Sequence, residues 1–198
     1  MSLDSVTNIG FLTVTEHQRH GLIGGYLVLN YLGRPVEFHC TSPVRTSRAQ
    51  EILYGVTLNP FLYGEQIAQL LIRRAKIKPN TILTDIPHVL AVQEFVETSV
   101  CYIAGFSDKE KPVQFFNDET QTVEEMDSVL NSIAAVPGIS LRCWSDQRIG
   151  RYQLAVPELG AHSAEETVDE LKSISPIIDF LEPFERIRLA IAEAQKAA

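Results

Sequence analysis

The sequence lacks the features that would place the chain in a membrane, in a secretory route or around a structural zinc ion. No apolar run approaches the roughly 18–20 residues that span a bilayer. The first eight residues contain neither the basic nor the apolar segment of a secretory signal. Cysteine is sparse, and Cys40, Cys101 and Cys143 are far apart with no CxxC pair, which indicates buried reduced thiols. We therefore expect a soluble, cytoplasmic protein without membrane contact.

The sequence also lacks the short motifs of the common nucleotide-binding and hydrolytic sites. It contains no GxxxxGK[ST] loop and no GxGxxG after a strand pattern. It contains no GxSxG nucleophile turn and no HExxH pair. P-loop, dinucleotide-binding, serine-hydrolase and zinc-protease chemistry of the usual kinds is therefore not expected.

Positive charge is scarce overall but unevenly distributed. The chain carries 17 basic and 25 acidic residues, a formal net charge of −8, which disfavours binding to extended duplex nucleic acid. Residues 34–78 nevertheless contain seven basic and three acidic residues, whereas residues 79–198 contain nine basic and 20 acidic ones. The pattern predicts one basic region on an otherwise acidic body, unless these basic side chains simply solvate two helices.

Length and hydrophobicity predict a single globular α/β domain over residues 1–198. At 198 residues and 45% hydrophobic content, the chain can bury a core without disulfides or metals. Three strand patterns open it, joined by short turns that favour an antiparallel meander: Phe11–Thr15, Leu22–Leu29 and Val36–Thr41. Gly24 and Gly25 inside the second, apolar run indicate a bulge or a close approach by another segment.

Helix and strand patterns alternate after the meander, which favours parallel strands with helical crossovers. Expected helices begin at Ser47, Asn59, Pro87, Thr122, Ser163 and near Phe184. Expected strands are Thr81–Thr84, which ends at Asp85, Val100–Phe106, and a hairpin of Ile139–Trp144 and Arg151–Val156. The predicted fold class is α/β or α+β: a mixed sheet with an antiparallel three-strand start, then helix-linked parallel strands, and a C-terminal helix.

This order of three antiparallel strands, a helix and a strand ending in a carboxylate resembles the ribonuclease-H-like nucleases and integrases. In that group an acid on the first strand and an acid at the end of the fourth converge on two divalent metal ions. The resemblance implies a metal-dependent nuclease or phosphohydrolase, with Glu16 and Asp85 as the catalytic carboxylates and Mg²⁺ or Mn²⁺ as cofactor. The group places its first acid inside strand one, where this chain has Phe11–Thr15. Asp85 also suits the role of a helix cap.

A second resemblance covers about twenty residues. Gly24–Val36 contains an apolar strand, an Asn-x-x-Gly turn and a return strand, and is similar to the central hairpin of roadblock, longin and other profilin-like regulatory modules. There the hairpin forms a platform for dimerisation or for small ligands. This resemblance implies an interaction module.

Polar residues near two turns are further candidates for binding. Arg45, Ser47 and Arg48 surround a helix start and could hold a small anion, or could form an ordinary capped helix start. Glu16–His20 reads as a solvated loop, so no metal site is expected there. His39 is expected to be a partly buried structural residue in a strand.

Two functions follow. The absence of motifs favours a non-catalytic binding, scaffolding or regulatory module without cofactor. Its expected partner is a protein or a second copy of the chain rather than nucleic acid, with a small anion near residues 45–48. The alternative is the metal-dependent nuclease that uses Glu16 and Asp85.

Overall fold

The computed structural model describes residues 8–17, 21–105, 129–158 and 163–196. The strands are β1 (Asn8–His17), β2 (Gly21–Asn30), β3 (Pro35–Cys40), β4 (Thr81–Thr84), β5 (Ser99–Gly105), β6 (Trp144–Ile149) and β7 (Tyr152–Pro157). The longer helices are α1 (Arg48–Tyr54), η2 (Phe61–Ala68), α3 (Gln69–Arg74), η3 (Pro87–Phe95), α4 (Val129–Ala134), α5 (Ala164–Ile174) and α6 (Glu182–Lys196). The short ones are η1 (Gly55–Thr57), α2 (Leu58–Pro60) and η4 (Leu141–Cys143). The helix start expected at Thr122 lies outside the described residues.

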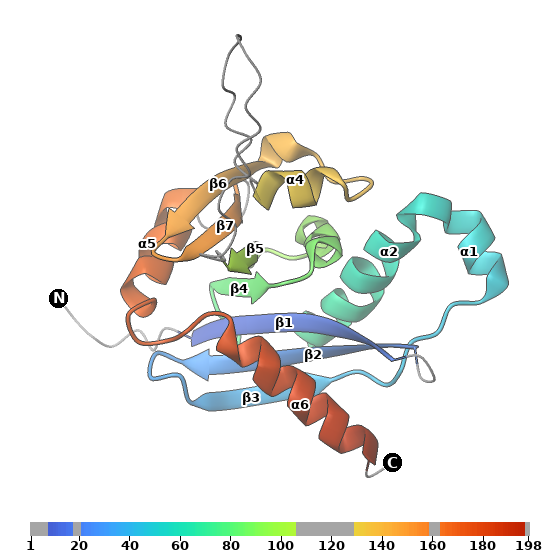
Figure 1. Cartoon of the computed structure of the whole chain (residues 1–198), viewed down its shortest axis with the longest axis horizontal. Coiled ribbons are helices and arrows are strands. Elements are labelled where there is room, and N and C mark those ends of the chain that lie inside the picture. The colour runs from blue at the N-terminus through green and yellow to red at the C-terminus, as the bar shows by residue number, and fades with distance from the viewer. Residues whose placement is uncertain (1–7, 18–20, 106–128, 159–162, 197–198) are drawn as a thin grey trace, which may run out of the picture.

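The strands form one seven-stranded mixed sheet in the order β3-β2-β1-β4-β5-β7-β6 (Figure 1). β1, β2 and β3 pair antiparallel, β1, β4 and β5 run parallel, and β7 returns antiparallel beside β5. The predicted fold class is therefore confirmed, including the antiparallel start, the helix-linked parallel strands and the C-terminal helix. No helix among the described residues is long and apolar enough to span a membrane.

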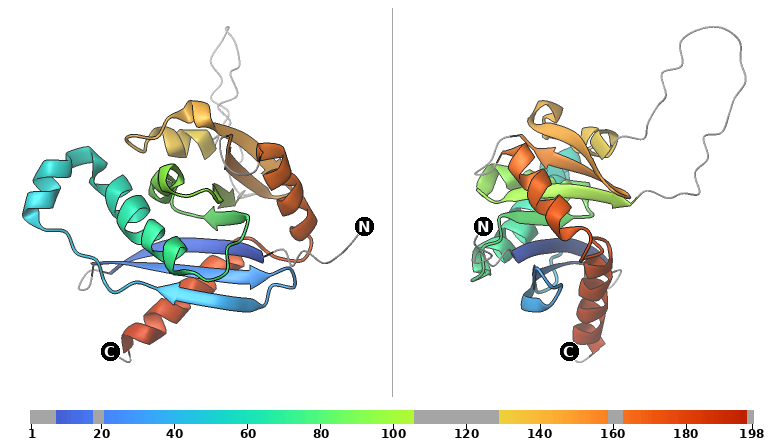
Figure 2. Two further views of the ribbon diagram at one scale, coloured as in Figure 1. Left: turned by 180° about the vertical axis from the view of Figure 1, so that it is seen from behind. Right: turned by 90° about the vertical axis from the view of Figure 1, so that its left-hand side faces the viewer.

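Helices cover both faces of the sheet. Figures 1 and 2 show α6 on one face of β1–β3 and the helix that continues from α2 on the other. On the α6 face, Phe11 and Leu83 pack with Phe184 and other apolar residues of α5 and α6. On the opposite face, Leu12 and Ile82 pack with residues of η2, α3, η3 and α4. Alternate residues of each strand thus contribute to two separate cores, as period-two side-chain alternation requires.

Two neighbouring glycines let helices approach both faces of β2. A Cβ atom added at Gly24 would lie 2.1 Å from Cγ2 of Ile67, and one added at Gly25 would lie 2.2 Å from Cγ2 of Ile187. Ile67 belongs to η2 and Ile187 to α6, so the two glycines point at helices on opposite faces. The expected close approach is confirmed, and it explains glycine in the interior of a strand.

Two of the three helix starts with the capping-box pattern, Ser47 and Ser163, lie in the described residues, and both carry the box. Ser47 at the start of α1 and Ser163 at the start of α5 each accept the backbone amide three residues later. Gly55 follows α1 with a positive φ of 52°, a conformation that favours glycine.

Two local predictions were wrong in detail. The helix expected from Asn59 begins at Leu58 without a side-chain cap, and its central part, η2, has π-helical hydrogen bonding. The helix expected from Pro87 is confirmed, and it is a 3₁₀ helix. The hairpin starts at Trp144, so that Gly150, with a φ of 58°, lies in its tight turn. Hydrogen-bond geometry of this kind depends on tertiary packing, which local sequence patterns do not contain.

Only one of the cysteines matches the expected burial. Cys101 on β5 is fully buried, and burial raises the pKa of its thiol far above the ordinary value. Cys143 is half-buried and Cys40 is exposed at the end of β3. Cys40 differs from expectation because β3 is an edge strand, where side chains receive little cover.

Glu37 ties this edge strand to the end of α3. Its carboxylate accepts the backbone amides of Lys76, at 2.9 Å, and Ile77, at 2.8 Å. His39 lies 2.7 Å from the same carboxylate, which confirms its expected structural role. These amide and imidazole hydrogen bonds lower the pKa of Glu37 to about 2.

We predict that Gly24→Ala lowers the free energy of unfolding by about 1–3 kcal/mol, because its Cβ would overlap Ile67. Urea denaturation measures this change. In the double variant Gly24→Ala/Ile67→Ala the new methyl enters space that Ile67 vacates, so the loss should be smaller than the sum of the two single losses. Additive losses would contradict the overlap.

We also predict a pH-dependent loss of stability for Glu37→Gln. The pKa of Glu37 is lower in the folded chain than its ordinary value of 4.5, so its contribution is complete above that value and disappears as the pH falls towards 2. The wild-type advantage over Glu37→Gln, measured by urea denaturation, should therefore shrink over this interval. Glu51→Gln serves as control, since Glu51 pairs with Arg48 in an exposed position. An advantage that is constant with pH would refute the assignment.

Candidate functional site

Asp85 follows β4 at the point where the parallel strands end. The pairing of Leu12 with Thr84 places the next residue of β1, Thr13, beside Asp85. The hydroxyl of Thr13 donates a hydrogen bond of 2.7 Å to Oδ1 of Asp85. The side chain of Thr84, and not that of Asp85, accepts the amide of Ile86, so the interpretation of Asp85 as a helix cap was wrong.

Arg188 of α6 forms an ion pair with the same carboxylate. Its guanidinium donates to Oδ2 of Asp85 and also to Glu185, one turn earlier on the helix. The side chains of Arg188 and Asp85 are 34% and 17% exposed, so solvent screens the pair only in part. Ile187, the neighbour of Arg188, sits against Gly25, and this contact fixes the height of α6 above the sheet. We call this arrangement the Thr13–Asp85–Arg188 cluster.

The residues of this cluster do not fit a two-metal centre. A divalent ion needs several oxygen ligands, preferably carboxylates. Thr13 on the first strand is the partner of Asp85, where the ribonuclease-H-like resemblance implies an acid, and a guanidinium neutralises the carboxylate of Asp85. Within the described ranges there is no group of three or more His, Cys, Asp and Glu side chains able to hold a metal ion.

Glu16 lies on the opposite face of the sheet. It lines a hollow of about 580 Å³ together with Arg45, Asn59 and Tyr63. Thr13 and Glu16 are three residues apart on one strand, so their side chains project to different faces. Burial, and secondarily the charge of Glu16, raise the pKa of Tyr63. The structure therefore brings Glu16 together with Arg45 and not with Asp85, and a catalytic role for either acid stays a prediction.

The predicted anion-binding residues have separate surroundings. Ser47 closes the capping box of α1, and Arg48 forms an exposed ion pair of 2.8 Å with Glu51. Of the three, Arg45 alone lines the hollow. The structure thus does not gather Arg45, Ser47 and Arg48 around one point.

The basic side chains of residues 34–78 are more exposed than the acidic side chains of the same segment. Its seven basic side chains are all exposed: Arg34, Arg45, Arg48, Arg73, Arg74, Lys76 and Lys78. Its three acids are only partly exposed, and two of them have partners in the structure: Glu37 accepts backbone amides and Glu51 pairs with Arg48. The basic side chains of this segment are therefore presented to solvent more openly than its acidic ones.

Sequence reasoning missed Thr13 and Arg188. Thr13 is one of several β-branched residues in a strand, and only its register with β4 reveals its partner. Arg188 lies three residues after Glu185, so its sequence context indicates an ordinary surface ion pair of a helix. No local signal connects residue 188 with residue 85.

Solved structures with a similar arrangement of elements include endonuclease V from two organisms. No protein-family model and no curated protein sequence matches the chain. Human endonuclease V is 14% identical, with a TM-score of 0.47, over 98% of this chain and 87% of that one. The catalytic domain of human endonuclease V is 11% identical, with a TM-score of 0.47, over 98% of this chain and 86% of that one. Endonuclease V from Ciona intestinalis, in complex with a 23mer DNA, is 14% identical, with a TM-score of 0.41, over 86% and 78%.

These matches correct one expectation from the sequence. A protein partner or a homodimer was expected in preference to nucleic acid, whereas the matched Ciona structure contains DNA. The net charge of the whole chain, −8, does not report the charge of one face. The roadblock-like hairpin does form, but β2 pairs on both sides inside the large sheet.

We predict that Asp85 and Arg188 stabilise the fold together. In a double-mutant cycle with Asp85→Asn and Arg188→Met, urea denaturation should give a coupling free energy of about 1–2 kcal/mol. The more exposed pair of Glu182 and Arg186 on the same helix is the control, with an expected coupling below about 0.5 kcal/mol. Equal couplings in the two cycles would show that the Asp85 pair is an ordinary surface contact.

Proposed function

We propose that this chain is a nucleic-acid-binding protein of ribonuclease-H-like build that does not cleave its ligand by two-metal chemistry. Such a protein is still a non-catalytic module, but its partner is nucleic acid in place of a protein.

The observation that carries the proposal is the ion pair between Arg188 and Asp85. Asp85 is the acid at the end of the fourth strand, the position at which the resembling nucleases hold metal ions. A cation entering here would have to displace a guanidinium from its carboxylate and would then find a threonine hydroxyl as the next ligand. Glu16 projects from the other face and lines a different hollow, so it supplies no second carboxylate to Asp85.

Exposed positive charge supports binding to a phosphate backbone. Arg73, Arg74 and Lys76 are exposed close together at the end of α3. Glu37, the acid whose carboxylate accepts the amide of Lys76, is mostly covered. Arginine and lysine side chains in such a group displace counterions from nucleic acid, which gives affinity without sequence preference.

The second candidate is the metal-dependent nuclease itself. It is favoured by the position of Asp85 at the carboxyl end of a parallel strand, where catalytic residues of open α/β sheets gather. The two candidates share binding and differ in whether products form.

Binding and cleavage can be tested on one set of labelled substrates. We predict that short single-stranded and double-stranded DNA and RNA bind the full chain in fluorescence anisotropy, with affinity that falls as salt rises. Arg73→Gln/Arg74→Gln should reduce the slope of the logarithm of the binding constant against the logarithm of the salt concentration by about two. Lys172→Gln on α5 should leave this slope unchanged. No binding to any of these substrates would refute the proposal.

Incubation of the same substrates with Mg²⁺ or Mn²⁺ separates the two candidates. Intact substrate is expected for the wild type, and products that disappear in Asp85→Asn would establish the nuclease instead.

Arg188→Glu adds a carboxylate where the guanidinium lies, so Mn²⁺ should raise its melting temperature more than that of wild type. Asp85→Asn/Arg188→Glu, which lacks one of the two carboxylates, is the matched control.

A further inference from the structure

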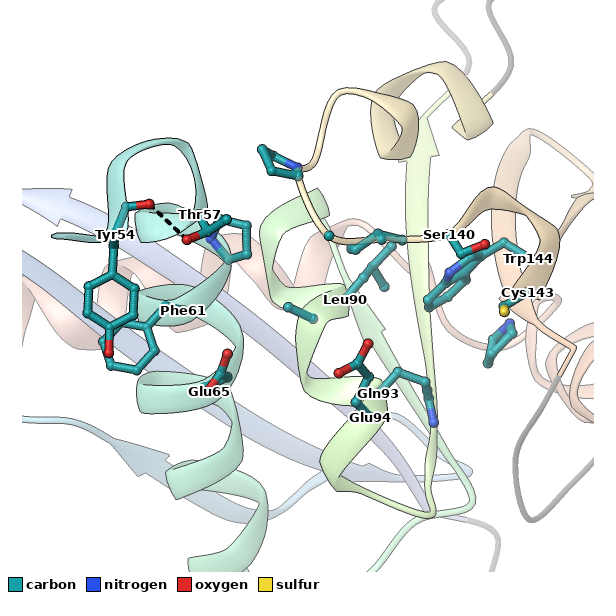
Figure 3. A pocket seen from close by; sticks show the side chains of 16 residues that line it. Tyr54, Thr57, Phe61, Glu65, Leu90, Gln93, Glu94, Ser140, Cys143 and Trp144 are labelled. Atoms are coloured by element: carbon teal, nitrogen blue, oxygen red, sulfur yellow. Dashed lines mark hydrogen bonds between the residues drawn. The ribbon is translucent and has the colours of Figure 1, made fainter. Parts of the chain in front are cut away.

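A second concavity lies away from the cluster and from the hollow of Glu16. It has a volume of about 460 Å³ and is bounded by η2, η3 and the segment that leads into β6 (Figure 3). Its size falls in the range of pockets that hold small organic ligands. The residues that matter for its chemistry are Tyr54, Phe61, Glu65, Leu90, Glu94 and Trp144.

The walls of this pocket are aromatic and apolar. Figure 3 shows Tyr54 and Phe61 at one end and Trp144 at the other, with Leu90 between them. The rings of Tyr54 and Phe61 are stacked, with centroids 4.1 Å apart and planes at 20°. Flat, rigid walls of this kind suit a planar ligand, because ring faces can then stack with little loss of side-chain freedom.

The helices η2 and η3, which form one side of the pocket, pack closely against each other. A Cβ atom at Gly64 would lie 2.7 Å from Cβ of Ala91 and 2.9 Å from the backbone nitrogen of Val92. The two helices therefore touch through their backbones beside the pocket. Phe61 and Glu65 belong to the same π-helical segment, whose wider turn brings residues four to five apart onto one side. Such π-helical turns often occur at functional sites.

Two of the polar groups that line the pocket, the carboxylates of Glu65 and Glu94, are hydrogen-bond acceptors only. Glu65 and Glu94 extend from the two facing helices (Figure 3). The side chain of Gln93 is engaged by Val100, whose amide it accepts at 2.8 Å, and the hydroxyl of Thr57 donates to the carbonyl of Tyr54. Among the lining residues that the structure describes, none is Lys, Arg or His. A complementary ligand is thus planar, carries N–H donors at one edge and has no negative charge at that edge.

We propose that this pocket binds an unpaired guanine base, a proposal that rests on the proposed function in nucleic-acid binding. Guanine presents two adjacent donors, N1–H and the N2 amine, which together match one carboxylate. In adenine and cytosine the single amino donor lies beside a ring nitrogen acceptor, whose lone pair would face a carboxylate lone pair. Thymine has one N–H donor between two carbonyl acceptors. Single-stranded nucleic acids present bases in this unstacked form, held by aromatic side chains and by their Watson–Crick edge.

The phosphates of such a strand stay outside the pocket, since Glu65 and Glu94 repel them. Arg142 lies next to Cys143, a lining residue, and is exposed. It adds an exposed positive charge to the segment that carries the lining residues Ser140 and Cys143. The base and the backbone are therefore recognised by separate groups, which is the division between specificity and affinity common in nucleic-acid binding.

The single tryptophan of the chain makes the pocket directly observable. Trp144 is the only tryptophan and lines the pocket, so its fluorescence reports occupancy. We predict that guanosine quenches this fluorescence in the full-length chain with at least about tenfold higher affinity than adenosine, cytidine or uridine, a factor typical of one good bidentate contact. N-acetyltryptophanamide under the same titration corrects for absorption by the nucleosides.

Variants test which groups read the base. Glu65→Gln/Glu94→Gln keeps shape and removes the two charged acceptors, so the preference for guanosine should fall to about twofold or less. Glu97→Gln changes an exposed acid beyond η3 that does not line the pocket, and should retain the full preference. Thermal melting of all variants confirms that they are folded. Equal quenching by guanosine and adenosine, or an undiminished preference in the double variant, would overturn the proposal.

A parallel titration separates this proposal from the proposed function. Oligothymidine carrying one central guanine should bind at least about fivefold tighter than oligothymidine carrying one central adenine, and only in chains with Glu65 and Glu94 intact. Binding of both oligomers with equal affinity would overturn the guanine pocket and leave nucleic-acid binding in place. Guanosine binding without binding of any oligomer would overturn the proposed function and leave the preference of the pocket in place.

Discussion

The distance between β2 and the helices on its two faces governs the positions of all the functional candidates. Gly24 and Gly25 have no side chains, so Ile67 of η2 and Ile187 of α6 rest almost directly on the backbone of the strand. Arg188 follows Ile187 and is thereby held within reach of Asp85. On the other face, the same close seating positions η2, and with it the aromatic and acidic residues of the pocket. Larger side chains in β2 would lift both helices away from the sheet at once.

The Thr13–Asp85–Arg188 cluster and the pocket differ in how their carboxylates are surrounded. At the end of β4 a carboxylate is neutralised within the protein, by Arg188 and by the hydroxyl of Thr13. In the pocket between η2 and η3, carboxylates meet apolar walls and no lining cation. The carboxylate of the cluster already has a cationic partner within the protein, whereas the carboxylates of the pocket are complementary to a ligand from outside the chain. We infer recognition at the pocket and stabilisation at the cluster for this reason.

Much of the fold could be predicted because its signals are local. The apolar run of β2, its adjacent glycines and the capping boxes at Ser47 and Ser163 each express a constraint within a few residues, and each was confirmed. The helix types of η2 and η3 could not be predicted, since their hydrogen bonding follows from how they pack on each other. The face of the sheet to which Glu16 projects could not be predicted, because a shift of one residue along a strand moves a side chain to the other face. The partnership of Asp85 with Arg188 joins residues 103 positions apart and has no local signal.

The ion pair at the end of β4 has an evolutionary consequence. Replacing Arg188 alone leaves the mostly covered Asp85 carboxylate with the Thr13 hydroxyl but without its counter-charge, which costs stability. Replacing Asp85 alone leaves the guanidinium its second partner, Glu185, and is the milder change. Arg188 is thus expected to be lost only after or together with Asp85, whereas Asp85 can be replaced first.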